Sequence, residues 1–418
     1  MSSSYLVFLR RNPQFRRLWY GQIVSEMGDW FHTIALYTLL LKLTHSGEAV
    51  GGLMMAQFLP AALVGPWAGT VVDRLPRRRV MVGADLIRAG LVLLLLLIRD
   101  DSMVWLAYVV TPVMVAMSSF FEPARAAAVA TLVERRDLVS ANAISSATWS
   151  CMLAVGAALG GFTASALGVH GAFLIDSVSF LLSALLLMGL RMEEPHLATE
   201  HPRPGMLREG LEYLGGHRVI ALYASVKGLW SLGAGIMLVL TLFGERVFTL
   251  GTDGALSIGL LYAARGLGAG VGPFLARRFG DGSVVGLRRA LGPAFLCTGL
   301  GYALLGYAPT LLAGAAAVFL AHLGGSTQWV YSTALLQMEV PNRLRGRVFA
   351  VELTLYTLAS ALSNYLVGLG ADAGLAPATL SMGLAGSFVL TGTALLFACW
   401  KGPEVPGGGT EDSAATEC

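Results

Sequence analysis

Residues 69–81 read GTVVDRLPRRRVM, a basic stretch that separates two long apolar runs. The chain around it has 418 residues, of which 55% are hydrophobic and 13% charged, and its mean hydropathy is +0.66. Soluble domains carry about 25% charged residues, so this chain has too few polar side chains to cover a protein of its size in water. Apolar runs such as 91–98 (LVLLLLLI) fit a lipid environment instead. We therefore expect an all-α protein that crosses a membrane many times.

Hydropathy, read with the Gly, Pro and charged residues that interrupt it, predicts twelve transmembrane helices. Their expected ranges are 18–43, 49–72, 80–98, 103–122, 138–167, 171–190, 218–243, 254–276, 287–307, 309–332, 347–370 and 376–400. A polar connection with three prolines divides them six and six. The expected domains are an N-terminal segment (1–17), a six-helix bundle (18–190), a central loop (191–217), a second six-helix bundle (218–400) and a polar, glycine-rich tail expected to be disordered (401–418).

The basic residues predict the orientation. If the N-terminus is cytoplasmic, 23 of the 29 Lys and Arg residues fall in the tail and connections on the cytoplasmic side. Cytoplasmic loops of membrane proteins carry such an excess. We expect a monomeric multi-pass protein of the cell's inner (plasma) membrane, with both termini and the central loop in the cytoplasm.

Several function classes lack their sequence signals. A nucleotide-binding P-loop needs Gly-Lys followed by Ser or Thr, but the three lysines follow Leu41, Val226 and Trp400. The cysteines have no metal-ligand spacing, and the seven histidines are scattered. We therefore expect no ATP site, metal, cofactor or nucleic-acid partner. A polytopic membrane enzyme is the alternative from another class, but it would need acidic and His residues clustered at one membrane face.

The stretch 69–81 resembles the signature of the major facilitator superfamily, Gly-x-x-x-Asp-Arg-x-Gly-Arg-[Arg/Lys]. Pro76 stands where that family usually has glycine, and a degenerate echo, GPFLARRFG, occupies 272–280 in the second half. The resemblance implies two pseudo-symmetric six-helix bundles and a cytoplasmic gate in which Asp73 faces the start of the helix near 342–348. The alternative is a plain basic loop that anchors topology. The candidate gate residues are Gly69, Asp73, Arg74, Arg77 and Arg78, with Glu122 and Arg125 beside them.

Phrases spread over nearly the whole chain, among them NPQFRRLWYGQIVSEMGDW, ADLIRAG, FFEPARAAA, SANAISSATW and STQWVYSTALLQMEVPNRLRGRV, extend the resemblance. They are similar to the branch containing enterobactin exporters, macrolide-efflux proteins and lysophospholipid transporters. The resemblance implies a secondary active transporter that exports an amphipathic small molecule (a drug, a macrolide-like natural product or a siderophore) by alternating access. A lysophospholipid or lipid transporter of the same fold is the alternative. Residues 156–161 (GAALGG) lack the proline common in proton antiporters of the superfamily, which leaves antiport or uniport open.

The first predicted helix carries charges near its middle. Gln22, Glu26, Asp29 and Thr33 form one polar stripe at helical spacing, and His32 lies nearby. Charges at such depth usually face a cavity or a partner. One hypothesis is that the stripe lines a central cavity that binds the small-molecule substrate. A carboxylate there would bind and release a proton, the expected coupling ion, during each turnover. The other is a fixed ion pair with Lys227 or Arg265, and the two can both hold in part. These six residues, Gln22, Glu26, Asp29, His32, Lys227 and Arg265, are the cavity candidates.

Other intramembrane residues are expected to be structural. Asp85 and Arg88, three residues apart, can pair with one another. Asp176 and Glu352 are expected to be paired or wet, and His322 to be a satisfied packing residue. For Trp149, Trp230, Trp329, Phe31 and Tyr331, substrate stacking and helix packing are both open.

Overall fold

The computed structural model describes residues 5–134, 137–192, 206–278 and 283–400, with only the backbone at some helical positions, Gly69 and Asp73 among them. The described residues form helices and turns and contain no β-strand. The helices are α1 (Tyr5–Arg11), α2 (Pro13–Thr44), α3 (Gly47–Arg74), α4 (Arg77–Leu94), α5 (Trp105–Leu132), α6 (Leu138–Met188), α7 (Met206–Gly216), α8 (Arg218–Ser231), α9 (Ile236–Leu242), α10 (Ala255–Arg277), α11 (Val284–Gly306), α12 (Leu311–Glu339), α13 (Asn342–Asp372) and α14 (Pro377–Trp400). Short turns of other helix types, η1 (Leu95–Leu97), η2 (Asp101–Met103), η4 (Phe243–Val247) and η5 (Thr252–Gly254), lie between them.

All twelve predicted ranges coincide with helical structure. Two of them, 138–167 and 171–190, are the arms of α6, which turns at Gly168 with φ +75°, a backbone conformation that glycine adopts without steric cost. Seven helical segments of the described chain are long and apolar enough to cross a membrane. The all-α membrane fold is therefore confirmed, while the count of twelve crossings stays a prediction.

The predicted domain boundaries also stay predictions. Residues 193–205 of the central loop and the whole tail, 401–418, lie outside the described residues. The last part of the predicted loop forms the helix α7.

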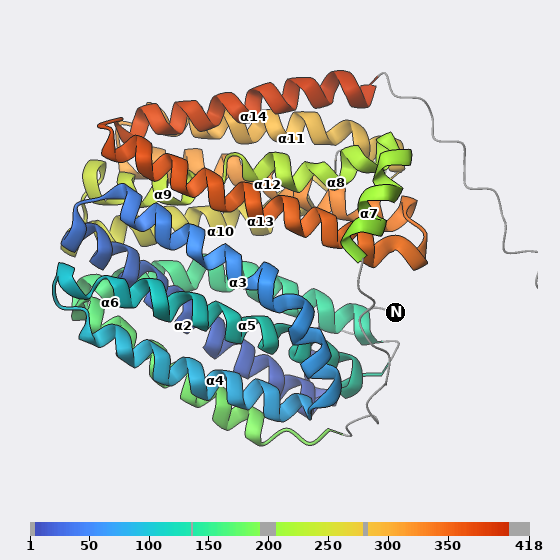
Figure 1. The fold of residues 1–418 in the computed structure, drawn as a ribbon, viewed down its shortest axis with the longest axis horizontal. Coiled ribbons are helices and arrows are strands. Elements are labelled where there is room, and N and C mark those ends of the chain that lie inside the picture. The colour runs from blue at the N-terminus through green and yellow to red at the C-terminus, as the bar shows by residue number, and fades with distance from the viewer. Residues whose placement is uncertain (1–4, 135–136, 193–205, 279–282, 401–418) are drawn as a thin grey trace, which may run out of the picture.

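The helices form two groups that lie side by side (Figure 1). We call α2–α6 the N-terminal group and α8–α14 the C-terminal group. The N-terminus and the end of α14 lie at the same end of the bundle, which we call the terminal face; the other end is the distal face. The larger buried apolar cluster contains residues of both groups, such as Leu36 and Leu238, so the two groups share a core.

Two pairs of helices join the groups: α6 packs on α10, and α3 packs on α13. Glycines allow the first pair to approach closely. A Cβ atom at Gly259 would lie 2.6 Å from the carbonyl oxygen of Ala157 and 2.9 Å from the Cα atom of Gly161. Backbones that touch in this way bring helices together in lipid without the help of large side chains.

The distal end of the α3–α13 pair is held by a carboxylate. Asp372, at the end of α13, accepts hydrogen bonds from the Ser46 hydroxyl (2.5 Å) and from the backbone N–H groups of Gly47 (2.6 Å) and Glu48 (3.1 Å) at the start of α3. The N-terminus of a helix is a favourable place for a negative charge. Asp372 therefore couples the two groups at the distal face, and we call this contact the distal latch.

One predicted helix is broken. The range 218–243 contains α8 and α9, which are separated by residues 232–235. Ser363 on α13 donates a hydrogen bond to the Leu232 carbonyl oxygen (2.7 Å) and accepts one from the Gly235 N–H (3.0 Å). A break inside a membrane is tolerated when neighbouring groups satisfy the freed backbone in this way. Broken helices often border the substrate site of transporters.

The α6–α10 contact predicts the effect of a larger side chain at Gly259. In Gly259→Val, the new methyl groups meet the backbone of Ala157 and Gly161, and overpacking of this kind costs about 1–3 kcal/mol. We expect a lower melting temperature in detergent, measured by fluorescence-detected thermal unfolding. Gly386→Val on α14 is the matched control, because a Cβ there has no neighbour within 4 Å. Equal melting temperatures for the two variants would contradict the packing described.

Candidate functional site

A cavity of about 240 Å³ lies between the two groups. Its walls contain residues of α2, α3, α6 and α9, so both groups contribute to it. The lining residues are Glu26, Asp29, Trp30, Thr33, Tyr37, Gln57, Trp149 and Met237. It therefore combines two carboxylates with aromatic and apolar walls.

The polar stripe of α2 faces this cavity in part. Glu26, Asp29 and Thr33 line it, as the helical spacing predicts. Gln22, one turn earlier, donates a hydrogen bond to Glu26 Oε1 (2.8 Å) and accepts one from Arg125 of α5 (3.2 Å). Gln22 thus orients a cavity carboxylate without lining the cavity.

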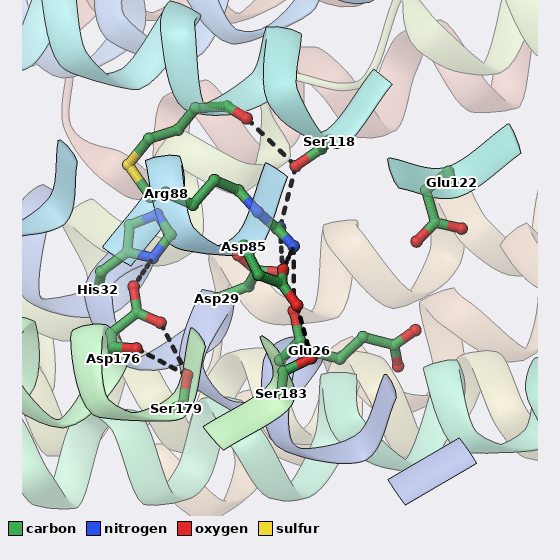
Figure 2. Close-up of polar contacts among 12 residues, drawn as sticks. Glu26, Asp29, His32, Asp85, Arg88, Ser118, Glu122, Asp176, Ser179 and Ser183 are labelled. Atoms are coloured by element: carbon green, nitrogen blue, oxygen red, sulfur yellow. Dashed lines mark hydrogen bonds and ion pairs between the residues drawn. The ribbon is translucent and has the colours of Figure 1, made fainter. Parts of the chain in front are cut away.

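His32 does not line the cavity. Its Nδ1 atom lies 2.6 Å from Oδ2 of Asp176 on α6, and Figure 2 shows the ring directed toward that carboxyl group. Asp176 is fully buried and also accepts a hydrogen bond from the Ser179 hydroxyl (3.2 Å). This contact ties α2 to the second arm of α6. The sequence did not identify this partner, because the two residues lie far apart in the chain.

Asp29 and Asp85 share Arg88, and the three side chains meet in Figure 2. Arg88 is 2.5 Å from Oδ1 of Asp85 but 3.7 Å from Oδ2 of Asp29. The hydroxyl of Ser183 also donates to Asp85 (2.6 Å). The Asp85 side chain is fully buried, whereas that of Asp29 is 39% exposed. The predicted Asp85–Arg88 pair is confirmed, and it leaves Asp29 as the more loosely held carboxylate.

Further contacts fix the Arg88 guanidinium in place. It donates to the hydroxyl groups of Ser25 and Ser118, both at 3.2 Å. It also lies over the rings of Phe180 (4.3 Å) and Phe121 (5.0 Å), a favourable cation–π arrangement. Arg88 is thus part of the structure of the N-terminal group.

The suggestion that Lys227 pairs with a carboxylate of α2 is wrong for this conformation. Lys227 lies 3.0 Å from Glu352 of α13, within the C-terminal group, and over the ring of Trp329 at 4.6 Å. Arg265 forms no ion pair with Glu26 or Asp29 either, and its Nε atom has no hydrogen-bond partner in the described part of the chain. Oε2 of Glu26 is likewise buried without a hydrogen-bond partner among the described residues.

The candidate gate lies at the terminal face. The structure describes only the backbone at Gly69, Asp73, Asn342 and Arg343. The contact between Asp73 and α13 therefore stays a prediction. Arg74 is exposed, and Arg77 donates to the Ala127 carbonyl oxygen (3.0 Å) and the Thr131 hydroxyl (2.6 Å) of α5. Arg78 donates to the Leu190 carbonyl oxygen (3.0 Å). These contacts of Arg77 and Arg78 stay within the N-terminal group.

Glu122 and Arg125 form an ion pair on α5 (2.7 Å), and Arg125 also reaches Gln22. Arg125 therefore connects α5 with the polar stripe of α2. The sequence placed this pair beside the candidate gate, but the structure also connects it, through Gln22, to the cavity carboxylate Glu26.

Aromatic rings continue from the cavity into the C-terminal group. Phe58, Tyr356, Trp329 and Trp230 contact one another in sequence, with ring centroids 5.2–6.0 Å apart. Trp30 packs edge-on against Tyr262 of α10 at 6.0 Å. Of the aromatic residues proposed for substrate stacking, Trp149 lines the cavity. Trp30, Tyr37, Gln57 and Met237 were not identified from the sequence, because nothing but their place in the fold distinguishes them.

A cavity between two helix groups, a broken helix beside it and carboxylates at membrane depth are features of membrane transporters. Comparison with known proteins agrees with this class. Residues 18–364 match the sequence profile of the Major Facilitator Superfamily, and the chain belongs to that family.

The relatives and the solved structures are consistent with the family. The uncharacterized MFS-type transporter YfiS of Bacillus subtilis (strain 168) is 29% identical over 200 residues, 46% of this chain and 47% of YfiS. BacE of Bacillus amyloliquefaciens, named as a candidate bacilysin exporter, is 24% identical over 91% of this chain and 94% of its own. Macrolide efflux protein A of Streptococcus pyogenes is 26% identical over 52% of this chain and 53% of its own. The chain thus spans about half the length of some of these relatives. The crystal structure of a mutant of the nucleoside transporter NupG has the same fold, with a TM-score of 0.74 at 13% identity over 93% of this chain and 99% of NupG.

The arrangement around Arg88 predicts a large loss of stability in Arg88→Gln. The change leaves the fully buried Asp85 without a cation, and breaking a buried pair costs about 3–5 kcal/mol. We expect a markedly lower melting temperature in detergent, with partial recovery in Asp85→Asn/Arg88→Gln because the stranded charge is also removed. Arg208→Gln, which breaks an exposed pair with Glu212, is the control and should change little. An Arg88→Gln protein as stable as the control would rule out this role.

Proposed function

We propose that this protein is a secondary active exporter of amphipathic small molecules, and that protons returning down their gradient drive it by alternating access. The observation that carries the proposal is the cavity between the two groups, with Glu26 and Asp29 in its wall. A site lined by both groups is open to one side of the membrane or the other as the groups rock about it.

The cavity wall suits an amphipathic substrate. Trp30, Tyr37, Trp149 and Met237 offer aromatic and apolar surface, while Glu26 and Asp29 offer negative charge. Such a wall favours molecules with an apolar body and a protonated amine. The names of two relatives, a macrolide efflux protein and a candidate bacilysin exporter, support export of natural products.

The cavity carboxylates suit proton exchange because neither is committed to a tight ion pair. Arg88 is closer to Asp85 than to Asp29, and Glu26 has one buried oxygen without a partner among the described residues. A proton crossing 100 mV releases about 2.3 kcal/mol. This free energy would support about a 50-fold concentration gradient of a neutral substrate.

The terminal face is the cytoplasmic face in this proposal, as the distribution of Lys and Arg predicts. The Asp73 gate would then close the cytoplasmic side and the distal latch the outer side. The two contacts are related in form. In the expected gate the carboxylate of Asp73 would face the start of α13, and in the distal latch Asp372 at the end of α13 binds the start of α3.

Substitution of the cavity carboxylates tests the coupling. In proteoliposomes with an imposed pH gradient, we expect Glu26→Gln and Asp29→Asn to lower gradient-driven accumulation of erythromycin or ethidium at least tenfold, because an amide cannot exchange a proton. A variant that has lost only proton coupling should still exchange the same probe across the liposome membrane when no pH gradient is imposed.

The control for this experiment is Glu212→Gln, a carboxylate that is exposed on α7 and pairs with Arg208. It should behave like the unmodified protein. Full gradient-driven accumulation in both Glu26→Gln and Asp29→Asn would exclude these residues as the proton site. No movement of any amphipathic probe by the unmodified protein would exclude the export function.

The distal latch predicts a conformational effect of Asp372→Asn. Loss of the charge weakens its hold on the start of α3, a contact worth about 0.3–2 kcal/mol. Ala371, which is 5% exposed and packs against Gly47, should become more accessible. In a variant without native cysteines, we expect Ala371→Cys to react several-fold faster with an impermeant maleimide outside intact cells when Asp372→Asn is also present.

Asp100→Asn is the matched control, since Asp100 accepts hydrogen bonds from Ser102 within its own turn. It should leave the labelling rate of Ala371→Cys unchanged. An unchanged rate in Asp372→Asn as well would show that the distal latch does not hold the outer side closed.

A further inference from the structure

Arg265 is an unusual cation for its position. It is the eleventh residue of the 23-residue α10, about 15 Å along the helix from its start at the distal face. A charge near the middle of a membrane is costly unless it is paired or faces water. Two other cations deep within predicted spans are paired, Arg88 with Asp85 and Lys227 with Glu352. In the described part of the chain, Arg265 has neither an ion pair nor a hydrogen bond at its buried Nε atom.

The groups that surround Arg265 do not neutralise it. Tyr262 lies one turn before Arg265 on α10, and His322 of α12 packs against Gly268, one turn after it, with its Cβ atom 3.0 Å from the position of a Cβ there. These are a phenol and an imidazole, and both have hydrogen-bond partners of their own. Tyr262 donates to the Met237 carbonyl oxygen (2.9 Å), and Tyr302 bonds to His322 (2.6 Å). The pocket around the guanidinium is thus polar but contains no compensating carboxylate among the residues described.

This surrounding region adjoins the cavity. Met237 and Trp30 line the cavity and contact Tyr262, one turn before Arg265: Tyr262 donates a hydrogen bond to the Met237 carbonyl oxygen, and its ring packs against that of Trp30. Glu26 and Asp29 line the same cavity from α2. The site therefore has negative charge on the N-terminal group and an uncompensated positive charge on the C-terminal group.

Unused polar groups lie nearby on α8 and α12. Gln328 is 1% exposed, and both polar atoms of its amide lack partners in the described chain, as does Nε1 of Trp230. A Cβ atom at Gly325, one turn before Gln328, would lie 3.2 Å from Nε1 of Trp230 and 3.7 Å from Nδ1 of His322. Buried polar atoms without partners cost free energy, and a bound ligand that accepts hydrogen bonds from the donors Gln328 Nε2 and Trp230 Nε1 would remove part of that cost.

We propose that the exported molecule carries an anionic group, a carboxylate or a phosphate, that binds the Arg265 guanidinium, while a protonated amine at its other end faces Glu26 and Asp29. This inference rests on the proposed export function and narrows its substrates to zwitterionic amphiphiles. The planar guanidinium matches both kinds of anion, because it can donate two parallel hydrogen bonds to two oxygens.

Matched probes that differ only in the anion test the inference. The probes are alanyl-tryptophan and its C-terminal amide, with lysophosphatidylethanolamine and its uncharged phosphate methyl ester as the lipid pair. In proteoliposomes, we expect the anion-bearing member of one pair to be transported at least tenfold faster than its partner. Faster transport of the peptide acid identifies a carboxylate, and faster transport of the lysophospholipid identifies a phosphate.

Arg265→Gln should remove this preference by slowing the anion-bearing probe to the rate of its partner, while Arg265→Lys should keep part of it. Arg246→Gln, at the exposed pair with Glu245, should leave the preference unchanged. Arg265→Gln should also be at least as thermally stable as the unmodified protein, because it removes an uncompensated charge. A strongly destabilised Arg265→Gln protein would show a structural role and overturn the inference.

The outcomes separate this inference from the proposed function. If the protein exports erythromycin or ethidium but moves both members of each pair equally, the export function stands and the anion site is excluded. If it moves none of the probes, the export function itself fails, and the inference fails with it.

Discussion

The arrangement of this protein depends on one constraint: a charge inside a membrane must be paired or must face a polar cavity. In the N-terminal group, Asp85 meets this demand for Arg88, with serine hydroxyls and aromatic rings around the guanidinium. In the C-terminal group, Glu352 does the same for Lys227. Because these two cations already have close partners, Asp29 is left on the cavity wall with only the longer contact to Arg88 (3.7 Å), and Glu26 with no ion pair among the described residues. The structural ion pairs thus determine which charges are available for function.

The contacts between the groups suit movement as well as assembly. Around Gly161 and Gly259 the backbones of α6 and α10 touch without interlocking side chains, so the groups can change their relative angle without repacking large residues. At the distal face, a single carboxylate binds the start of α3. A contact of that type is worth about 0.3–2 kcal/mol, which is comparable to the free energy from one proton at 100 mV. Such a latch can open during each transport cycle.

The sequence predicted the fold well because its signals are local. Apolar runs and the stretch 69–81 are recognised from residues that are neighbours in the chain, whereas the contact of Gly161 with Gly259 joins distant segments. The Asp85–Arg88 pair was also predictable, because three residues separate the partners on one helix. The break at 232–235 was missed for two reasons. The glycines within it also occur in packed membrane helices, and Ser363, which stabilises the break, is distant in sequence.

The site was predicted less completely, because its partners come from distant parts of the chain. The stripe of α2 was visible from helical spacing, but the partner of His32 is on α6 and that of Lys227 on α13. Tyr37, Gln57 and Met237 have no distinguishing pattern, and only the packing of three helices brings them to one cavity. The periodicity of a single helix can therefore identify its polar face, but it cannot identify the residues of other helices that contact that face.

Opposite charges on opposite groups give a physical reason for exchange between substrate and proton. In the proposed site, Glu26 and Asp29 on one group and Arg265 on the other carry opposite charges, and a zwitterion would compensate both walls at once. A proton that binds a carboxylate of α2 removes the negative charge to which the amine was attracted, while the anion remains held by Arg265 alone. Because one of two attachments is then lost, the substrate dissociates more readily. Proton uptake and substrate release at one cavity would thus be linked by charge compensation, without a separate coupling site.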